Sequence, residues 1–236
     1  MPLGGPKQRA VLAVLLLQAN RVVSKDQLID SVWGEHPPKR VDAALQNVIL
    51  RLRRAFDEEG LIEFRDPGYV LNVSPEHVDA LQFEQLVAAA EGLAPPERAA
   101  ALRQALGLWR SAPLADLAYE DFAQDAIMRL DELRLVAQER LFDAELELGR
   151  HDAVLVEIEA LAARNPTREH LRELLMLALY RADRQRDALR VFEETRRELI
   201  EQFGLEPSER LRALQRRILM QDETLHPPQA VPAAAS

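Results

Sequence analysis

The stretch LQNVILRLRRAFDEEG, residues 45–60, sets three arginines among aliphatic residues and then turns acidic. Because a helix advances by about 100° per residue, its large apolar side chains fall within roughly 40° of one line. These side chains are Leu45, Ile49, Leu52 and Phe56. Such a stripe is typical of a helix that packs against a core. We therefore expect a helix that starts near Arg40 or Val41 and ends near Gly60.

The opposite side of this helix is polar. It carries Arg40, Asn47, Arg51 and Arg54, at roughly 180° to 240° from the first leucine. Such a face can enter the major groove of DNA, where arginine pairs with guanine and asparagine with adenine. Arg53 lies to the side, in a position suited to a phosphate. Taken alone, the face also fits an ordinary solvated helix surface, since charged side chains are mostly exposed.

Two further helices are expected ahead of this one. KQRAVLAVLLLQANR, residues 7–21, is apolar enough to be buried, and Pro6 suits its first turn. SKDQLIDSVWG begins at Ser24, and Gln27 completes a capping-box pattern. Pro37-Pro38 then requires a loop, because proline is excluded from a helix interior.

A β-hairpin is expected after the arginine-bearing helix. LIEFR and YVLNV are β-prone runs on either side of Asp66-Pro67-Gly68. The hairpin would bring Arg65 near a flanking DNA backbone or minor groove. The order of helix, helix, proline turn, helix and hairpin is that of a winged helix-turn-helix. This context favours DNA contact over the solvated-surface interpretation.

From Glu76 onward the pattern is helical throughout. Helices are expected at about 79–92, 95–110, 119–148, 152–164, 167–182, 185–203 and 207–221. The segment AELELGR at 144–150 is followed 34 residues later by ALYRADR, a spacing typical of tetratricopeptide-like helix pairs. The fold class is therefore mainly α, with a winged-helix domain at 1–75, a tetratricopeptide-like domain at 76–222 and a flexible tail or linker at 223–236.

Composition narrows the class of protein. The chain has 236 residues, 47% of them hydrophobic, and no cysteine, so neither disulfides nor thiolate metal sites are expected. The longest apolar run is too short to span a bilayer, which predicts a cytoplasmic protein without membrane contact. The net charge of −9 argues against a general polyanion binder. Residues 1–75, however, carry 10 basic and 9 acidic side chains, which leaves room for a local DNA site.

No constellation of catalytic residues is evident. The five histidines lack metal-ligand spacing, so no metal is expected. The glycine pair at Gly4-Gly5 lacks the pattern of a phosphate-binding loop, and no nucleophile motif is present. We therefore expect neither an enzyme nor a bound cofactor.

Long co-linear stretches resemble one family. LGGPKQRAVLAVLLLQANRVVSKDQLIDSVWG, ALQNVILRLRRAF and RDPGYVLNV resemble the OmpR/PhoB-type winged helix of the Streptomyces antibiotic regulatory protein (SARP) family. VDALQFEQLV, LGRHDAVLVEIEALAARNP, LRELLMLALYRADRQRDALRVFEETRREL and GLEPSERLRALQRRIL resemble its bacterial transcriptional activator domain. Together these segments cover nearly the whole chain in the order in which the family has them.

The resemblance implies a transcriptional activator that binds direct repeats near promoters, often as a pair of protomers, and contacts RNA polymerase. Arg51 lies where the family commonly reads bases, and Arg53 and Arg54 lie where it holds phosphates. The implied partners are thus double-stranded DNA, RNA polymerase and a second copy of the chain.

Some positions depart from the family pattern. Val48 and Leu50 are aliphatic where relatives often carry polar residues, and Val70 stands where an arginine often follows the Gly-Tyr pair of the wing. The small N-terminal β-sheet of the family is not apparent, so the wing is expected to lack a strand neighbour. With the near-neutral first domain, these departures leave an alternative function, a protein-interaction scaffold whose winged helix has lost DNA binding.

Overall fold

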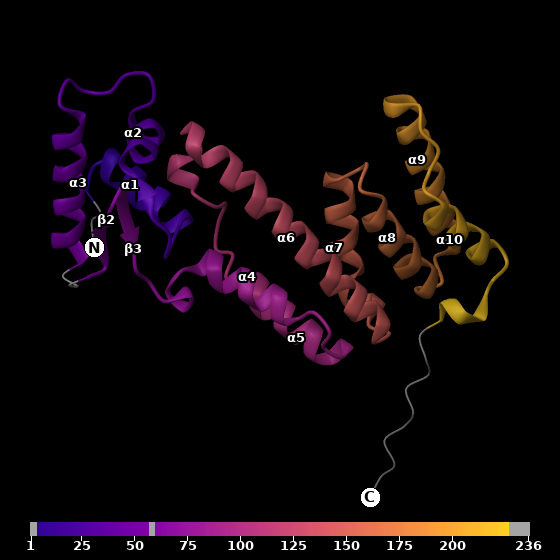
Figure 1. Ribbon diagram of the computed structural model, residues 1–236. Coiled ribbons are helices and arrows are strands. Elements are labelled where there is room, and N and C mark those ends of the chain that lie inside the picture. Colours follow the sequence, from indigo (N-terminus) through magenta and orange to yellow (C-terminus); the bar gives the residue numbers. More distant parts are fainter. Residues whose placement is uncertain (1–3, 57–59, 227–236) are drawn as a thin grey trace, which may run out of the picture. The chain divides into compact units, whose positions relative to one another are not determined.

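The computed structural model describes residues 4–56 and 60–226 (Figure 1). The chain forms two compact units. Unit 1 comprises Met1–Gln85 and Gly107–Arg134, and unit 2 comprises Leu86–Leu106 and Leu135–Ser236. Unit 1 thus extends beyond the expected winged-helix domain, because residues 76–85 and 107–134 also belong to it. The functional division at residue 75 remains a prediction.

Unit 1 begins with the three expected helices, α1 (Pro6–Leu17), α2 (Lys25–Trp33) and α3 (Val41–Phe56). At the start of α2, the Ser24 hydroxyl accepts a hydrogen bond from the Gln27 backbone amide at 3.1 Å, as the capping pattern predicts. The expected end of α3 near Gly60 is not tested, because residues 57–59 lie outside the described residues.

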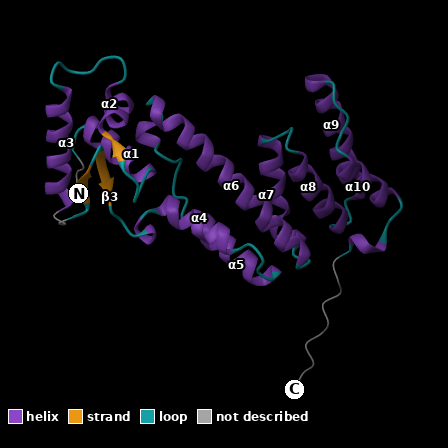
Figure 2. Cartoon of the chain, in the orientation of Figure 1, coloured by secondary structure: helices purple, strands orange, loops and turns teal. Residues whose placement is uncertain are grey.

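Three short strands complete the winged helix: β1 (Val23–Ser24), β2 (Ile62–Arg65) and β3 (Gly68–Leu71). They form an antiparallel sheet in the order β1-β3-β2 (Figure 2). The predicted hairpin is confirmed by the pairs from Ile62–Leu71 to Arg65–Gly68. The expectation that the wing lacks a strand neighbour is wrong, because β1 pairs Val23 with Tyr69 on the other edge of β3.

The core of unit 1 joins the helices to this sheet. Its fully buried side chains include Val11 and Leu15 of α1, Leu28 of α2 and Leu52 of α3. Leu117, from the 3-10 helix η2 (Ala115–Leu117), belongs to the same cluster. Residues beyond the winged helix therefore help to bury its apolar side. The remaining elements that contribute to unit 1 are η1 (Pro75–His77), the start of α4 (Asp79–Ala89) and the first half of α6 (Asp121–Glu147).

Unit 2 is helical in its described part. Its elements include α5 (Pro95–Leu106), α7 (His151–Arg164), α8 (Glu169–Arg181), α9 (Gln185–Phe203), α10 (Glu209–Leu219) and the 3-10 helix η3 (Glu223–Leu225). Each predicted helix is present, and consecutive helices α7, α8 and α9 pack against one another, as expected for tetratricopeptide-like pairs. The expected tail at 223–236 begins inside this unit, because Leu225 is buried in its core, while residues 227–236 lie outside the described residues.

Across residues 4–56 and 60–226, no helix has the length and apolar character that crossing a bilayer requires.

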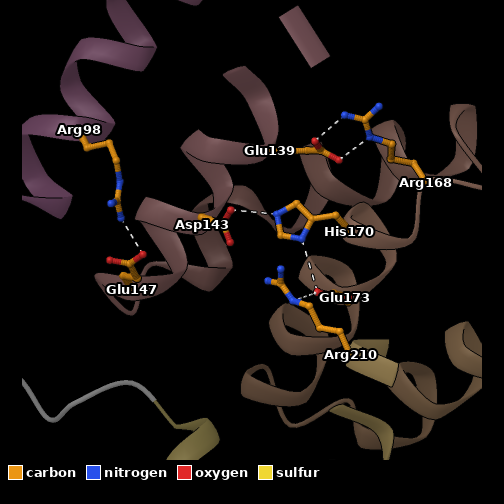
Figure 3. A network of polar contacts seen from close by, with 8 residues as sticks. All are labelled: Arg98, Glu139, Asp143, Glu147, Arg168, His170, Glu173 and Arg210. Carbon is orange, nitrogen blue, oxygen red and sulfur yellow. Dashed lines mark hydrogen bonds and ion pairs between the residues drawn. The ribbon is translucent and has the colours of Figure 1, made fainter. Parts of the chain in front are cut away.

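A network of charged side chains ties α6, α8 and α10 together in unit 2 (Figure 3). Arg168 donates two hydrogen bonds to Glu139, each 3.0 Å long, in the forked geometry that arginine forms with carboxylates. His170 lies between two acids, with Nε2 2.9 Å from Asp143 and Nδ1 3.5 Å from Glu173. Arg210 of α10 pairs with Glu173 at 2.6 Å.

The two acids hold His170 in its charged form. Its hydrogen bond to Asp143, and then that to Glu173, raise the pKa of His170 from 6.5 to about 9, although burial acts in the opposite direction. Both ring nitrogens can donate when the imidazole is protonated. A raised pKa means that protonation stabilises the folded state. This stabilisation is complete below about pH 6.5 and is lost as the pH rises toward 9.

We expect the stability of unit 2 to fall with rising pH through His170. Between pH 6.5 and 9, the loss should be about 1–2 kcal/mol, allowing for a ring that is 27% exposed. Urea unfolding of the wild type and of His170→Gln at several pH values provides the measurement. The difference in unfolding free energy between the wild type and His170→Gln should shrink steadily as the pH rises from 6.5 to 9. Parallel stability curves would show that the imidazolium contributes nothing specific.

Candidate nucleic-acid interface

Helix α3 has one buried side and one exposed side. Leu45, Ile49 and Leu52 are at most 2% exposed and belong to the unit 1 core, while Phe56 near the end of the helix is half-buried. The predicted apolar stripe is therefore confirmed. Because these four side chains pack against the core, the opposite side of the helix faces solvent.

The predicted DNA-binding side chains of α3 are exposed together. Asn47, Arg51 and Arg54 are exposed, as is Arg40 immediately before the helix. Within the described residues, the side chains of Arg40, Arg51 and Arg54 have neither a hydrogen bond nor an ion pair. Among the described residues, therefore, nothing competes with an external acceptor for these guanidinium groups, and arginine suits paired acceptors on guanine or phosphate. Whether they bind DNA remains a prediction.

Arg53 is turned toward the wing. Its Nε donates a 2.8 Å hydrogen bond to the backbone carbonyl of Ile62 in β2. This bond joins α3 to the hairpin and leaves the terminal nitrogens of the guanidinium without a bond to any described residue. Arg53 therefore has a structural role that the sequence did not indicate, in addition to the phosphate role predicted for it.

Arg65 lies on the wing, apart from the α3 cluster, and is paired. Its guanidinium is 3.0 Å from the carboxylate of Glu63. The hydrogen bond from Arg65, followed by one from Asn72, lowers the pKa of Glu63 below its usual value. Both side chains are largely exposed, and such pairs are weak. A phosphate can therefore compete with Glu63 for Arg65.

A further cation, which no sequence motif indicated, lies beside the wing. Lys25, the first residue of α2, places its ammonium group 4.9 Å from the centre of the Phe64 ring. Phe64 in turn contacts Tyr69 edge-to-face, with ring centres 5.5 Å apart. The Lys25 amide also donates to Pro67 in the hairpin turn at 3.3 Å. Only the pairing of β1 with β3 brings this lysine to the wing, so its own surroundings in the sequence do not reveal it.

The aliphatic departures on α3 have different environments. Val48 is half-buried and packs against the unit 1 core, which accounts for an apolar residue there. Leu50 is 44% exposed, on the same helix as the arginines. Val70 is buried in β3, where its side chain is withdrawn from solvent. Of the three, Leu50 is the one exposed to solvent.

These features make one surface suited to nucleic acid. Helix α3 presents arginine and asparagine, and the hairpin tied to it by Arg53 carries Arg65, with Lys25 of α2 beside it. This is the arrangement in which a helix reads the major groove and a wing meets the adjacent backbone. No chemical transformation is implied by these groups.

Comparison with known proteins agrees with this geometry. The family described as "Transcriptional regulatory protein, C terminal" matches residues 3–71, and the family described as "Bacterial transcriptional activator domain" matches residues 78–219. The regulatory protein DnrI of Streptomyces peucetius is 38% identical over 248 residues, covering 98% of this chain and 90% of DnrI. The regulatory protein AfsR of Streptomyces griseus is 39% identical over 234 residues, but the match spans only 24% of AfsR.

A solved structure is also similar. Mycobacterium tuberculosis EmbR, determined in complex with a low-affinity phosphopeptide, has a TM-score of 0.89 and 34% identity, over 94% of this chain and 61% of EmbR. The chain thus spans about a quarter of AfsR and most of DnrI. The matched families are domains of transcriptional regulators, EmbR is named a transcriptional regulatory protein, and AfsR and DnrI are named regulatory proteins. The chain belongs to the bacterial transcriptional activator domain family and, with its winged helix, to the SARP-type transcriptional regulators.

Proposed function

We propose that this protein is a transcriptional activator that binds duplex DNA through α3 and the wing. The observation that carries the proposal is the exposed stripe of Asn47, Arg51 and Arg54, whose arginines are unpaired among the described residues, on a helix fixed by a buried leucine-isoleucine side. In this proposal Arg51 and Asn47 face base edges in the major groove. Family membership supports the same reading. The function is therefore binding and recruitment rather than catalysis.

The remaining cations are assigned to the DNA backbone, where they would position the protein. Arg53 and Arg54, near the end of α3, are assigned to phosphates, and Arg40 to a phosphate at the other end. Arg65 in the hairpin and Lys25 beside it would meet the neighbouring DNA backbone. Phosphate contacts fix the register of a protein on DNA without reading sequence. The proposed roles therefore divide between one reading helix and a surrounding set of anchors.

The helical domain is assigned the protein contacts. Residues 76–236 carry 20 basic and 30 acidic side chains, which disfavours DNA and suits a protein partner. We assign it contact with RNA polymerase and pairing of two protomers on a direct repeat. Footprinting together with gel filtration on a duplex with two half-sites tests the pairing. A single protomer on a single half-site would remove it.

Arg51→Ala should relax base preference at one position of the site. The expected cost is about 1–3 kcal/mol for the preferred base, against little change for the other bases. Duplexes selected from a random pool by the full chain supply the site, and competition binding measures the change.

Arg54→Ala should instead weaken binding to all sequences alike. The slope of the logarithm of the binding constant against the logarithm of the salt concentration should become shallower by about 1.

Arg197→Ala is the matched control, because Arg197 is an exposed arginine on α9 that forms no ion pair with any described residue. It should leave DNA affinity unchanged. If the wild type selects no sequence and its binding does not weaken with salt, the activator proposal fails. The scaffold alternative would then be preferred.

Removing the acid beside Arg65 should strengthen DNA binding. Glu63→Gln releases Arg65 from its ion pair and removes a negative charge from the wing. We expect affinity to rise by about two- to fivefold at low salt, and the gain to shrink at high salt because both charges are exposed. In the Arg65→Ala background the same substitution should have a smaller effect. An equal gain in both backgrounds would show that Arg65 does not meet the DNA.

A further inference from the structure

Helix α3 carries an aliphatic side chain in the middle of its exposed polar side. Leu50 is exposed, whereas Val48, two residues earlier, packs against the unit 1 core. Single exposed leucines are common on protein surfaces, so exposure alone does not indicate a role. The position of Leu50 among the proposed reading residues is what distinguishes it.

Leu50 lies on the line of α3 that is farthest from the core. At about 100° per residue, it lies roughly 140° from Leu45, while Asn47 and Arg54 lie at roughly 200° and 180°. Residues three and four positions apart are neighbours on a helix surface, so Leu50 is flanked by both of these polar side chains. Ala43 falls at roughly 160° on the same line, where its small side chain leaves room for close approach. All four of these outward residues are exposed.

The base edges in the major groove determine what such a side chain can contact. Guanine, adenine and cytosine are read there by their hydrogen-bonding groups, while thymine also presents its C5 methyl group. Leucine neither donates nor accepts a side-chain hydrogen bond, and covering a polar base edge without replacing its hydrogen bonds to water is unfavourable. The thymine methyl is therefore the group on the major-groove edge that Leu50 can cover favourably.

We propose that Leu50 is a specificity-determining residue that packs against the C5 methyl group of a thymine. This inference rests on the proposed function, because it requires α3 to enter the major groove. It adds an apolar contact that selects thymine to the hydrogen bonds assigned to Asn47 and Arg51. If Leu50 instead faced a protein partner, its removal would not change the affinity for DNA.

Replacing thymine with uracil tests the contact, because the two bases differ only in the C5 methyl group. In the duplex that the full chain selects from a random pool, each thymine of the site is replaced in turn, and competition binding is measured. Replacing the contacted thymine should weaken binding of the wild type about fourfold, the scale of one buried methyl-sized group. At the same position, 5-methylcytosine should bind about fourfold more tightly than cytosine for the same reason.

Leu50→Ala removes the aliphatic contact with little risk to the fold, because the side chain is exposed and alanine favours a helix. This variant should bind the selected duplex at least about fourfold more weakly, and it should bind the thymine and uracil duplexes equally. Leu219→Ala is the matched control, because Leu219 is an exposed leucine in helix α10. It should keep both the wild-type affinity and the preference for thymine over uracil.

The outcomes separate this inference from the proposed function. If the wild type binds its selected site with a steep salt dependence, but every uracil replacement has the same effect in the wild type and in Leu50→Ala, the proposed function stands and the thymine contact is wrong. Leu50 would then be left for a protein partner. If the wild type selects no sequence, the proposed function fails and this inference fails with it.

Discussion

Arg103→Met should destabilise unit 2 by about 3 kcal/mol, because it leaves a buried carboxylate without its main partner. Glu145 of α6 has a side chain only 1% exposed, and Arg103 of α5 donates to one of its oxygens from Nε and from a terminal nitrogen at 3.1 and 3.0 Å. Arg150 reaches the other oxygen only at 3.5 Å. The loss should appear as a lower urea midpoint, with hydrogen exchange fastest in α5.

We expect this loss of stability to arise because the Glu145 carboxylate remains buried without its partner, rather than because a favourable contact is lost. Glu145→Leu combined with Arg103→Met replaces the pair with apolar groups, and we expect it to recover most of the stability. Arg140→Met is the control, since its ion pair with Glu91 at 2.8 Å is exposed on both sides and should contribute less than about 1 kcal/mol. Equal losses in the Arg103 and Arg140 variants would mean that burial of Glu145 does not decide the effect.

Local patterns were sufficient to predict most of the helices and the hairpin. The side of α3 that carries Leu45, Ile49 and Leu52 was predictable because the packing of a helix follows its own periodicity. Phe56 follows the predicted buried stripe less closely, since it lies in the last turn of α3 and is only half-buried. The cap at Ser24 was also readable, because its bond joins residues three positions apart.

Contacts between distant segments could not be predicted in this way. The bond from Arg53 to the Ile62 carbonyl depends on how the wing packs against α3, and the position of Lys25 depends on the pairing of β1 with β3. In the sequence, Glu145 looks like any acid of a solvated helix, yet it is buried against α5. The roles predicted for the exposed arginines remain predictions, because exposure alone does not identify the partner.

Gly68→Ala should destabilise the winged helix by about 3 kcal/mol through a backbone clash. Gly68 begins β3, opposite Ser24 of β1. A methyl group here would lie 1.8 Å from the Val23 carbonyl oxygen and 2.6 Å from Ser24 Cα, both of them backbone atoms. Rotation of a side chain cannot relieve such a contact, so β1 must separate from β3. Because Ser24 also caps α2, we expect DNA affinity to fall along with stability.

Gly5→Ala is the matched control, since a methyl group at Gly5 meets nothing within 4 Å and that glycine has an ordinary backbone conformation. It should cost less than about 1 kcal/mol, the scale of a weakened helix cap. Urea unfolding of both variants measures the loss, and hydrogen exchange of the Lys25 amide, which bonds the Pro67 carbonyl, reports whether β1 has moved. If Gly68→Ala keeps both its midpoint and the protection of Lys25, the two strands can part slightly at little cost. The wing would then be held chiefly by β2 and by the bond from Arg53, rather than by the strand that leads into α2.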